Sequence, residues 1–177
     1  MNSPNFSNGN LKLDQFLVCG LGYFGQHCVV ALKEFGVGVK AIEKEPPSTW
    51  ELPIVPELLD DLIVGDCRRK ATLEQAKIQR CRAALLVTSN EQVNIETALA
   101  IRRINPHTRL VVRSATNNLN QLLGEQLGNF IAYEPTELPT NAFALSALGT
   151  EILRQKPPPT SLLVATPVRD FPTAAWL

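Results

Sequence analysis

Short apolar runs alternate along the chain with longer stretches in which apolar residues recur every three or four positions. Residues 83–87 are apolar throughout, which is typical of a buried parallel strand, whereas 91–105 has the spacing of an amphipathic helix. The pattern predicts strands at 16–19, 37–43, 62–64, 83–87, 109–113 and 130–132. It predicts helices at 23–35, 71–79, 91–105, 117–127 and 138–148.

The segment after the second strand departs from this pattern because its prolines, Pro46, Pro47, Pro53 and Pro56, each remove a backbone donor. We expect a loop there, with one short helical turn at 56–60 that begins on a proline. Strands that alternate with helices through right-handed crossovers form a doubly wound parallel sheet, here of six strands in a three-layer α/β/α arrangement. Ligands bind such sheets beyond the carboxyl ends of the strands.

A glycine-rich turn, Gly20-Leu21-Gly22-Tyr23-Phe24-Gly25, joins the first strand to the first helix. Gly20 would make the tight turn, Gly22 would let the backbone approach a pyrophosphate, and Gly25 would let the helix pack closely on the strand. The phosphates would lie on the N–H groups at the positive end of the helix. This order of strand, turn and helix predicts a Rossmann-type fold with a nucleotide site.

The second strand ends on Glu43, about twenty residues past the turn, where a carboxylate would accept the ribose hydroxyls. The same charge would repel the extra phosphate of NADP, so NAD or NADH is the expected ligand. Lys44 would lie beside the ribose. The alternative is that the glycines make a structural turn and Glu43 is a solvated surface acid.

Polar residues also follow the third and fifth strands. Asp66 and Cys67 are expected to lie against the adenine, and the alternative for Asp66 is a cap on the next helix. Arg113 would reach a phosphate or a ribose, or would otherwise form a surface ion pair.

Three polar residues, Thr88, Ser89 and Asn90, follow the fourth strand and would contact the far half of a dinucleotide. Ser89 or Asn90 would serve equally well as the N-cap of the helix that follows. Asn94 is expected to order this loop rather than to touch the ligand.

The 177 residues carry 17 basic and 17 acidic side chains, so the formal net charge is zero and no nucleic-acid partner is indicated. The basic runs at 68–70 and 102–103 are interpreted as helix-surface charges. The polar N-terminus does not resemble a secretory signal, and no apolar stretch is long enough to span a bilayer.

Catalytic and metal-binding chemistry is not evident. Neither of the two histidines, His27 and His107, has a carboxylate partner at a meaningful spacing, which predicts a protein that is not an enzyme. The four cysteines form no C-x-x-C pair, which favours a reduced, cytoplasmic chain without a zinc site; they are Cys19, Cys28, Cys67 and Cys81.

We expect three parts along the chain. Residues 1–12 are rich in Asn and are predicted to be disordered, and 13–150 form the nucleotide-binding domain. Residues 151–177 are expected to be an irregular tail, since the helical pattern gives way to prolines at 157–159. A sharper hypothesis is that a second domain once followed and was lost by truncation or by a shift of the reading frame.

The chain resembles the RCK domains, also called TrkA-N domains, which regulate potassium channels and transporters. The resemblance runs from about residue 14 to about residue 148 and rests on the segments VCGLGYFG, AIEK, IVGDC, LVTSNEQVN and LVVRSA. It implies a Rossmann-type fold, a bound adenine nucleotide, a last helix that mediates dimer formation, and a cytoplasmic face toward a membrane ion transporter.

Three departures from the family pattern change what the resemblance implies. Family members that bind ATP commonly have an arginine where this chain has Tyr23, so a dinucleotide or AMP is favoured over ATP, with ADP also among the candidates. The small C-terminal ligand domain that often follows is expected to be absent. The order Tyr133-Glu134-Pro135 differs from the usual one, so no cation site at a dimer interface is carried over.

These observations together predict a nucleotide-sensing regulatory subunit or domain for potassium transport. Its partner would be a membrane potassium channel or transporter subunit, and it would act as a homodimer or a higher homo-oligomer. It would be cytoplasmic and peripheral to the inner membrane through that partner. The alternatives are an NAD-dependent oxidoreductase domain and a truncated relative without function.

Overall fold

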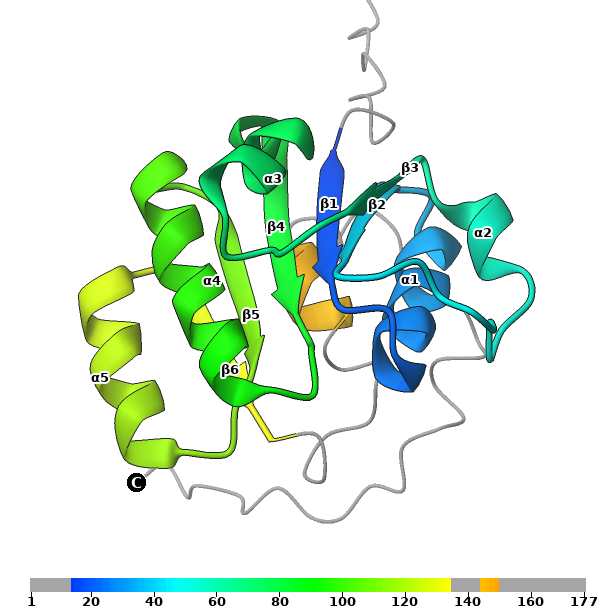
Figure 1. The fold of residues 1–177 in the computed structure, drawn as a ribbon. Helices are drawn as coiled ribbons and strands as arrows, with labels where there is room; N and C mark the ends of the chain where they lie inside the picture. The colour runs from blue at the N-terminus through cyan, green and yellow to red at the C-terminus, as the bar shows by residue number, and fades with distance from the viewer. Residues whose placement is uncertain (1–13, 135–143, 150–177) are drawn as a thin grey trace, which may run out of the picture.

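The computed structural model of this protein describes residues 14–134 and 144–149. Within that part of the chain, six parallel strands form one sheet in the order β3-β2-β1-β4-β5-β6 (Figure 1). The order reverses between β1 and β4, which places the switch point at the centre of the sheet. The strands are β1 (Gln15–Cys19), β2 (Gly38–Glu43), β3 (Asp61–Val64), β4 (Cys81–Leu86), β5 (Arg109–Arg113) and β6 (Phe130–Tyr133).

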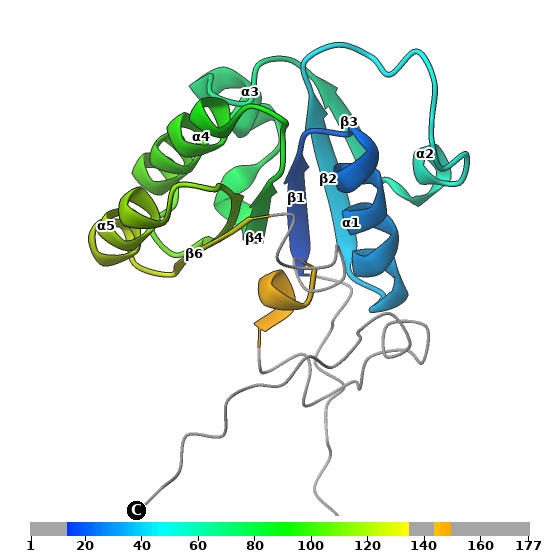
Figure 2. The same cartoon turned by 90° about the horizontal axis from the view of Figure 1, so that it is seen from below.

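Helices cover both faces of the sheet (Figure 2). The helix α1 and the helical residues 144–149 pack on one face, and α3 and α4 pack on the other. The three-layer, doubly wound architecture that the sequence predicts is therefore confirmed. The helices are α1 (Tyr23–Glu34), α2 (Val55–Leu58), α3 (Lys70–Gln75), the 3-10 helix η2 (Ile78–Arg80), α4 (Glu91–Ile104) and α5 (Asn117–Leu127).

Two predicted helical segments need correction. The helix expected at 71–79 ends at Gln75, because Lys77 takes a left-handed backbone conformation with φ of 60° and a 3-10 turn follows. The turn expected at 56–60 spans Val55–Leu58, and it ends there because Leu59 is already extended toward β3. Pro56 lies in the first turn, where its missing N–H removes no hydrogen bond.

Several predictions fall on residues outside the described ranges. These are the disordered segment 1–12, the tail 151–177 and the start of the helix expected at 138–148. Of that last helix, the structure describes the helical residues 144–149, in which Leu148 is fully buried as expected.

The core has two parts because successive side chains of a strand point to opposite faces of the sheet. In β1, Phe16 and Val18 pack toward α1, whereas Leu17 and Cys19 pack toward α3 and α4. All of 83–87 is at most 3% exposed, as the unbroken apolar run predicts.

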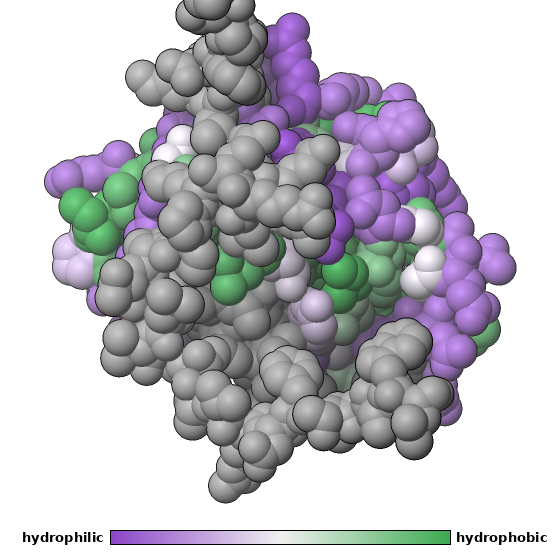
Figure 3. Space-filling model, turned by 180° about the vertical axis from the view of Figure 1, so that it is seen from behind, coloured by the Kyte–Doolittle hydropathy of each residue, from purple (hydrophilic) through white to green (hydrophobic). Residues whose placement is uncertain are grey.

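The outer helices bury less apolar surface than their sequence pattern suggests. In α4, Ala98 and Ile101 are fully buried, whereas Leu99 is 37% exposed. In α5, Leu122 is 60% exposed. From behind, hydrophobic residues are visible in the centre of the molecule and hydrophilic residues gather toward its edge (Figure 3). None of the described helices has the length and apolar character of a membrane span.

Replacing Leu85 with alanine should lower the free energy of unfolding by about 2–5 kcal/mol, because the substitution leaves a cavity in a close-packed core. Leu85 is fully buried on the central strand β4. The matched control is Leu122→Ala in the exposed part of α5, which should change stability by less than about 0.5 kcal/mol. Urea unfolding followed by circular dichroism measures both, and similar losses in the two variants would contradict this description of the core.

Candidate functional site

Three adjoining cavities follow the carboxyl ends of the strands. The first, of about 260 Å³, lies between the ends of β2, β3 and β4. The second, of about 560 Å³, lies over the glycine turn, and the third, of about 210 Å³, lies beside β5. Gly20, Glu43 and Thr88 line both the first and the second, and Thr88, Ser89 and Arg113 line both the second and the third. The cavities therefore form one crevice across the switch point.

The structure brings the predicted site residues together at this crevice. All of them line the first or the second cavity except Leu21 and Gly25, which are buried beneath the turn. The lining residues are Gly20, Gly22, Tyr23, Phe24, Glu43, Lys44, Asp66, Cys67, Thr88, Ser89, Asn90 and Arg113.

The three glycines of the turn are required for different reasons. Gly20 has φ of +98°, and a Cβ atom there would lie 2.9 Å from the backbone nitrogen of Thr88. A Cβ on Gly25 would lie 1.9 Å from the carbonyl oxygen of Gly20, so α1 could not begin this close to β1 with any other residue. A Cβ on Gly22 would meet nothing within 4 Å, and Gly22 faces the second cavity. The protein's own packing thus accounts for Gly20 and Gly25 but leaves the space beside Gly22 open.

Glu43 lies beside the glycine turn and not on an open surface. One of its carboxylate oxygens accepts the backbone N–H of Leu21, and the other accepts the N–H of Lys44 at 2.8 Å. Each oxygen has a second lone pair, so both can accept a further hydrogen bond from a ligand. Glu43 lines the first and second cavities at the end of β2, which disfavours the alternative of a solvated surface acid.

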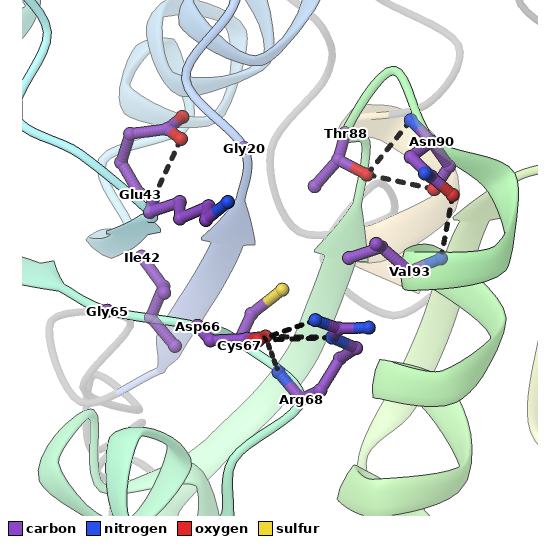
Figure 4. Close-up of a pocket in the computed structure, with 11 residues that line it drawn as sticks. Gly20, Ile42, Glu43, Gly65, Asp66, Cys67, Arg68, Thr88, Asn90 and Val93 are labelled. Atoms are coloured by element: carbon purple, nitrogen blue, oxygen red, sulfur yellow. Dashed lines mark hydrogen bonds and ion pairs between the residues drawn. The ribbon is translucent and has the colours of Figure 1, made fainter.

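Asp66 is bound to Arg68 on the floor of the first cavity (Figure 4). The Arg68 guanidinium donates to both oxygens of Asp66, at 2.7–3.2 Å, and to Glu96 on α4 at 3.0 Å. The guanidinium and the N–H of Arg68 lower the pKa of Asp66 to about 2. Asp66 does not cap α3, whose N-cap is Arg69 and has no side-chain cap. Because Arg68 lines the cavity, the interpretation of 68–70 as helix-surface charges is wrong at this residue.

Asn94 connects the ends of β4 and β5. Its side-chain oxygen accepts the N–H and the hydroxyl of Thr88 at 3.0 and 2.7 Å, and its amide donates to the carbonyls of Thr88 and Arg113 at 3.0 Å each. The side chain is 1% exposed, so it orders the loop, as the sequence predicts. Asn90, not Ser89, is the N-cap of α4, and its oxygen accepts the N–H of Val93 at 3.1 Å.

Opposite charges stand on either side of the second cavity. Arg113 lies with its guanidinium carbon 5.9 Å from the centre of the Phe24 ring, and Glu43 lines the other side. Tyr23, at the start of α1, is 65% exposed, and its ring lies 4.4 Å from that of His27. Arg113 thus supplies positive charge to this cavity, whereas Tyr23 supplies none.

Sequence reasoning missed several lining residues. Arg68 was recognisable only as the second residue after an acid, and Ile42 and Val93 carried no signal beyond their apolar side chains. Within the described ranges, no group of three or more His, Cys, Asp or Glu side chains could hold a metal ion.

The sequence profile of the TrkA-N domain matches residues 16–133, which include the whole sheet except Gln15 and every residue of the crevice except Glu134. The chain belongs to the TrkA-N domain family. The voltage-gated potassium channel Kch of Escherichia coli is 28% identical over 114 residues, which are 63% of this chain and 27% of Kch. Potassium channel protein 1 of Methanocaldococcus jannaschii is 24% identical over 102 residues, 57% of this chain and 30% of that protein. This TrkA-N chain therefore spans less than a third of either relative.

Solved structures share the fold at low identity. The TrkA-N domain of the inner membrane protein ybaL from Escherichia coli has a TM-score of 0.58 and 16% identity, over 71% of this chain and 90% of that one. The Kef C-terminal domain of Shewanella denitrificans, in its AMP-bound form, has a TM-score of 0.56 and 18% identity, over 80% and 85%. GsuK bound to ADP has a TM-score of 0.55 and 20% identity, over 83% and 36%. These likenesses show the fold of the TrkA-N chain.

Replacing Gly25 with alanine should lower the free energy of unfolding by about 3 kcal/mol or more, because the new methyl group meets backbone and not a mobile side chain. The matched control is Gly22→Ala, three residues earlier in the same turn. It should cost less than about 1 kcal/mol, the difference between the two residues at a helix N-cap. Equal losses in thermal or urea unfolding would contradict the close approach of α1 to β1.

Asp66 should make stability depend on pH in acid. Its pKa in the folded protein, about 2, lies below that of an unfolded aspartate, about 3.9, so the stabilisation by Arg68 is complete above about pH 4 and is lost as the pH falls through about 2. The difference in unfolding free energy between the native chain and Asp66→Asn should shrink over that range. Glu74→Gln, which removes an exposed 3.6 Å ion pair with Lys70, should show a smaller change. A difference that stays constant down to pH 2 would contradict the Asp66–Arg68 pairing.

Proposed function

We propose that this chain is a nucleotide-sensing regulatory subunit or domain of a potassium channel or transporter, and that NAD or NADH is its ligand. The observation that carries the proposal is the open space in front of Gly22, which lies between an acid on one side and an arginine on the other. A turn that served only to connect β1 to α1 would need Gly20 and Gly25 but not Gly22.

The ligand would lie along the crevice with its adenosine in the first cavity. Glu43 would accept the ribose hydroxyls with the lone pairs that the backbone leaves free. The diphosphate would lie in the second cavity, at the N-terminus of α1, where no side chain caps the helix and the first turn contains no acid. Asp66, Cys67 and Lys44 would surround the adenosine, and Thr88, Ser89 and Asn90 would lie toward the second half of the ligand.

The extent of the crevice favours a dinucleotide. The cavities continue past the glycine turn to Arg113 and Ser114, beyond the space that a mononucleotide would need. Tyr23 brings no charge for a third phosphate, which disfavours ATP, and Glu43 would repel the ribose phosphate of NADP. AMP and ADP are the competing ligands, since the fold neighbours include a protein bound to each.

The regulatory part of the proposal rests on the relatives. Both curated relatives are potassium channels, and the match covers less than a third of each, as a regulatory domain attached to a channel would. Nucleotide binding would bias a homodimer or a larger assembly, and through it a membrane partner on the cytoplasmic side. Such a switch requires that the ligand bind the two conformations with different affinities.

The alternative, an NAD-dependent oxidoreductase domain, shares the same fold. A xanthine dehydrogenase from Bacillus halodurans has a TM-score of 0.56 at 14% identity, so the fold by itself does not choose between sensor and enzyme. A sensor should bind NADH without consuming it. Loss of NADH absorbance with a panel of alcohols, aldehydes and hydroxy acids would favour the enzyme.

Replacing Glu43 with glutamine should weaken NAD binding about 10-fold to 100-fold, because a hydrogen bond to a charged group contributes about 1.5–3 kcal/mol. Binding of inorganic pyrophosphate should stay unchanged, since the proposed contact is with the sugar. The control Glu45→Gln changes an exposed residue outside the crevice. Titration calorimetry with NAD, NADH, NADP, AMP, ADP and ATP measures both effects.

Two results would contradict the proposal. Equal losses of NAD and pyrophosphate in Glu43→Gln would remove this acid from the ribose, and no binding of any of these nucleotides to the native chain would remove the site. The regulatory step has its own test: in the source organism, Gly22→Ala should keep the protein at its normal level but abolish the response of rubidium uptake to the cellular nucleotide pool.

A further inference from the structure

We propose that Cys67 and Cys19 form a peroxide-sensitive thiol pair beneath the crevice, and that a nucleotide bound in the first cavity protects the pair from oxidation. The second half of this proposal rests on the function proposed above, and the first half does not.

Cys67 is the one of the two that a small molecule can reach. It is 7% exposed, it lines the first cavity, and its sulfur points into that cavity (Figure 4). The loop after β3 carries it toward α4, where its sulfur lies 3.2 Å from the hydroxyl of Thr97. An oxidant that enters the first cavity therefore meets this sulfur.

Cys19 is the partner that the solvent cannot reach. It is the last residue of β1, it is fully buried directly before Gly20, and it belongs to the same buried cluster as Cys67. The register of the sheet excludes Cys81 as its partner. Cys19 stands opposite Leu86 of β4 whereas Cys81 stands near Gln15, about 13 Å away at the rise of a parallel strand, too far for a disulfide.

The two thiols differ in pKa, and a reactive pair requires such a difference. A hydrogen bond from Cys19, and one from Thr97, lower the pKa of Cys67 to about 7, against the opposing effects of burial and of Asp66. The pKa of Cys19 is raised by that same hydrogen bond, by burial, and by the charges of Cys67, Cys81 and Glu43. The Thr97 hydroxyl has a single proton, which it donates to the carbonyl oxygen of Val93 with 2.7 Å between the two oxygens, and the hydroxyl can turn to the sulfur once Cys67 is ionised. Cys67 is then the nucleophile, and Cys19 supplies the proton.

The oxidation balances with one molecule of hydrogen peroxide. The Cys67 thiolate attacks a peroxide oxygen, the O–O bond breaks, and hydroxide leaves, which takes up a proton to become water. The sulfur of Cys19 then attacks the sulfenic acid, forms the S–S bond and displaces a second water. Two thiols are oxidised by two electrons, and the peroxide is reduced to two waters.

A nucleotide in the first cavity would lie between this sulfur and the solvent. Glu43, Asp66 and Cys67 line the same 260 Å³, so an adenosine that fills the space covers the thiol. Oxidation of the empty protein would conversely draw the loop after β3 toward β1 and change the wall against which the base packs. The pair would thereby link the redox state to nucleotide occupancy.

The test oxidises the full-length chain with hydrogen peroxide and counts free thiols. In the native sequence the count should fall from four to two. Assignment uses the Cys28→Ser variant, in which trypsin leaves Cys19, Cys67 and Cys81 in three separate fragments, 13–33, 45–68 and 81–82. Mass spectrometry should find fragment 13–33 joined to fragment 45–68. Cys28 is a suitable residue to replace because it is buried on the other face of the sheet, among the side chains of α1.

Single variants separate the roles of the two sulfurs. In Cys19→Ala, Cys67 should stop at a sulfenic acid that dimedone traps, and in Cys67→Ala, Cys19 should stay reduced because no oxidant reaches it. Saturating NAD should slow disulfide formation at least about 10-fold in the native chain, the change expected when the reactive population falls to a tenth. Circular dichroism checks that each variant is folded.

The outcomes distinguish this proposal from the proposed function. A pair that stays reduced under peroxide in the folded protein, or a disulfide that joins Cys67 to Cys81, overturns the thiol pair. A disulfide that forms equally fast with NAD shown by calorimetry to be bound overturns the protection and leaves nucleotide binding in place. A disulfide in a protein that binds no nucleotide supports the pair and counts against the proposed function.

Discussion

The architecture of the crevice depends on one contact between backbones, where Gly25 of α1 meets the carbonyl of Gly20. No side chain fits between them, and this permits the helix to start only three residues after the strand that leads into it. The position of α1 then fixes the direction of its N-terminus. It also places Gly22 at the wall of the second cavity and the N–H of Leu21 within reach of Glu43. If α1 were displaced by the width of one methyl group, the direction of its N-terminus, the position of Gly22 and the contact of Glu43 with the turn would change together.

Polar side chains hold the rest of the rim in register with that turn. Asn94 ties the ends of β4 and β5 with four hydrogen bonds, and Arg68 ties the loop after β3 to α4 through Asp66 and Glu96. These groups lie at the ends of strands, where the ladder of the sheet no longer supplies partners for the backbone. The rim is therefore built from side chains, whereas the sheet beneath it is built from backbone and apolar packing.

This division explains how much the sequence could predict. The strands and the glycine turn follow from local patterns, since a strand buried on both faces is apolar throughout and each glycine has a steric reason within its own segment. The end of α3 was missed because lysine has no preference for the left-handed backbone conformation that Lys77 adopts. The tertiary packing of its buried neighbours Ala76 and Ile78 imposes that conformation. Arg68 was missed for a related reason: its partner Glu96 lies 28 residues further along the chain, and only the fold brings α4 to the loop after β3. Leu99 and Leu122 lie in correctly predicted helices but are exposed, because helical spacing gives the direction of a side chain and not whether another element covers it.

Glu43 belongs both to the sheet and to the rim of the crevice. Its backbone belongs to the β ladder, where its carbonyl accepts the N–H of Gly65, and its carboxylate accepts the N–H of Leu21 in the glycine turn. In the proposed complex the same carboxylate also accepts the ribose hydroxyls, so ligand binding adds hydrogen bonds to an acid that the turn already orients. The cost of ordering that side chain has been met in folding, which favours affinity. Because the carboxylate is hydrogen-bonded to the turn, a ligand that held the acid would also restrain the turn. A sensor needs such a link, because a ligand can select between two conformations only where it contacts a group whose position differs between them.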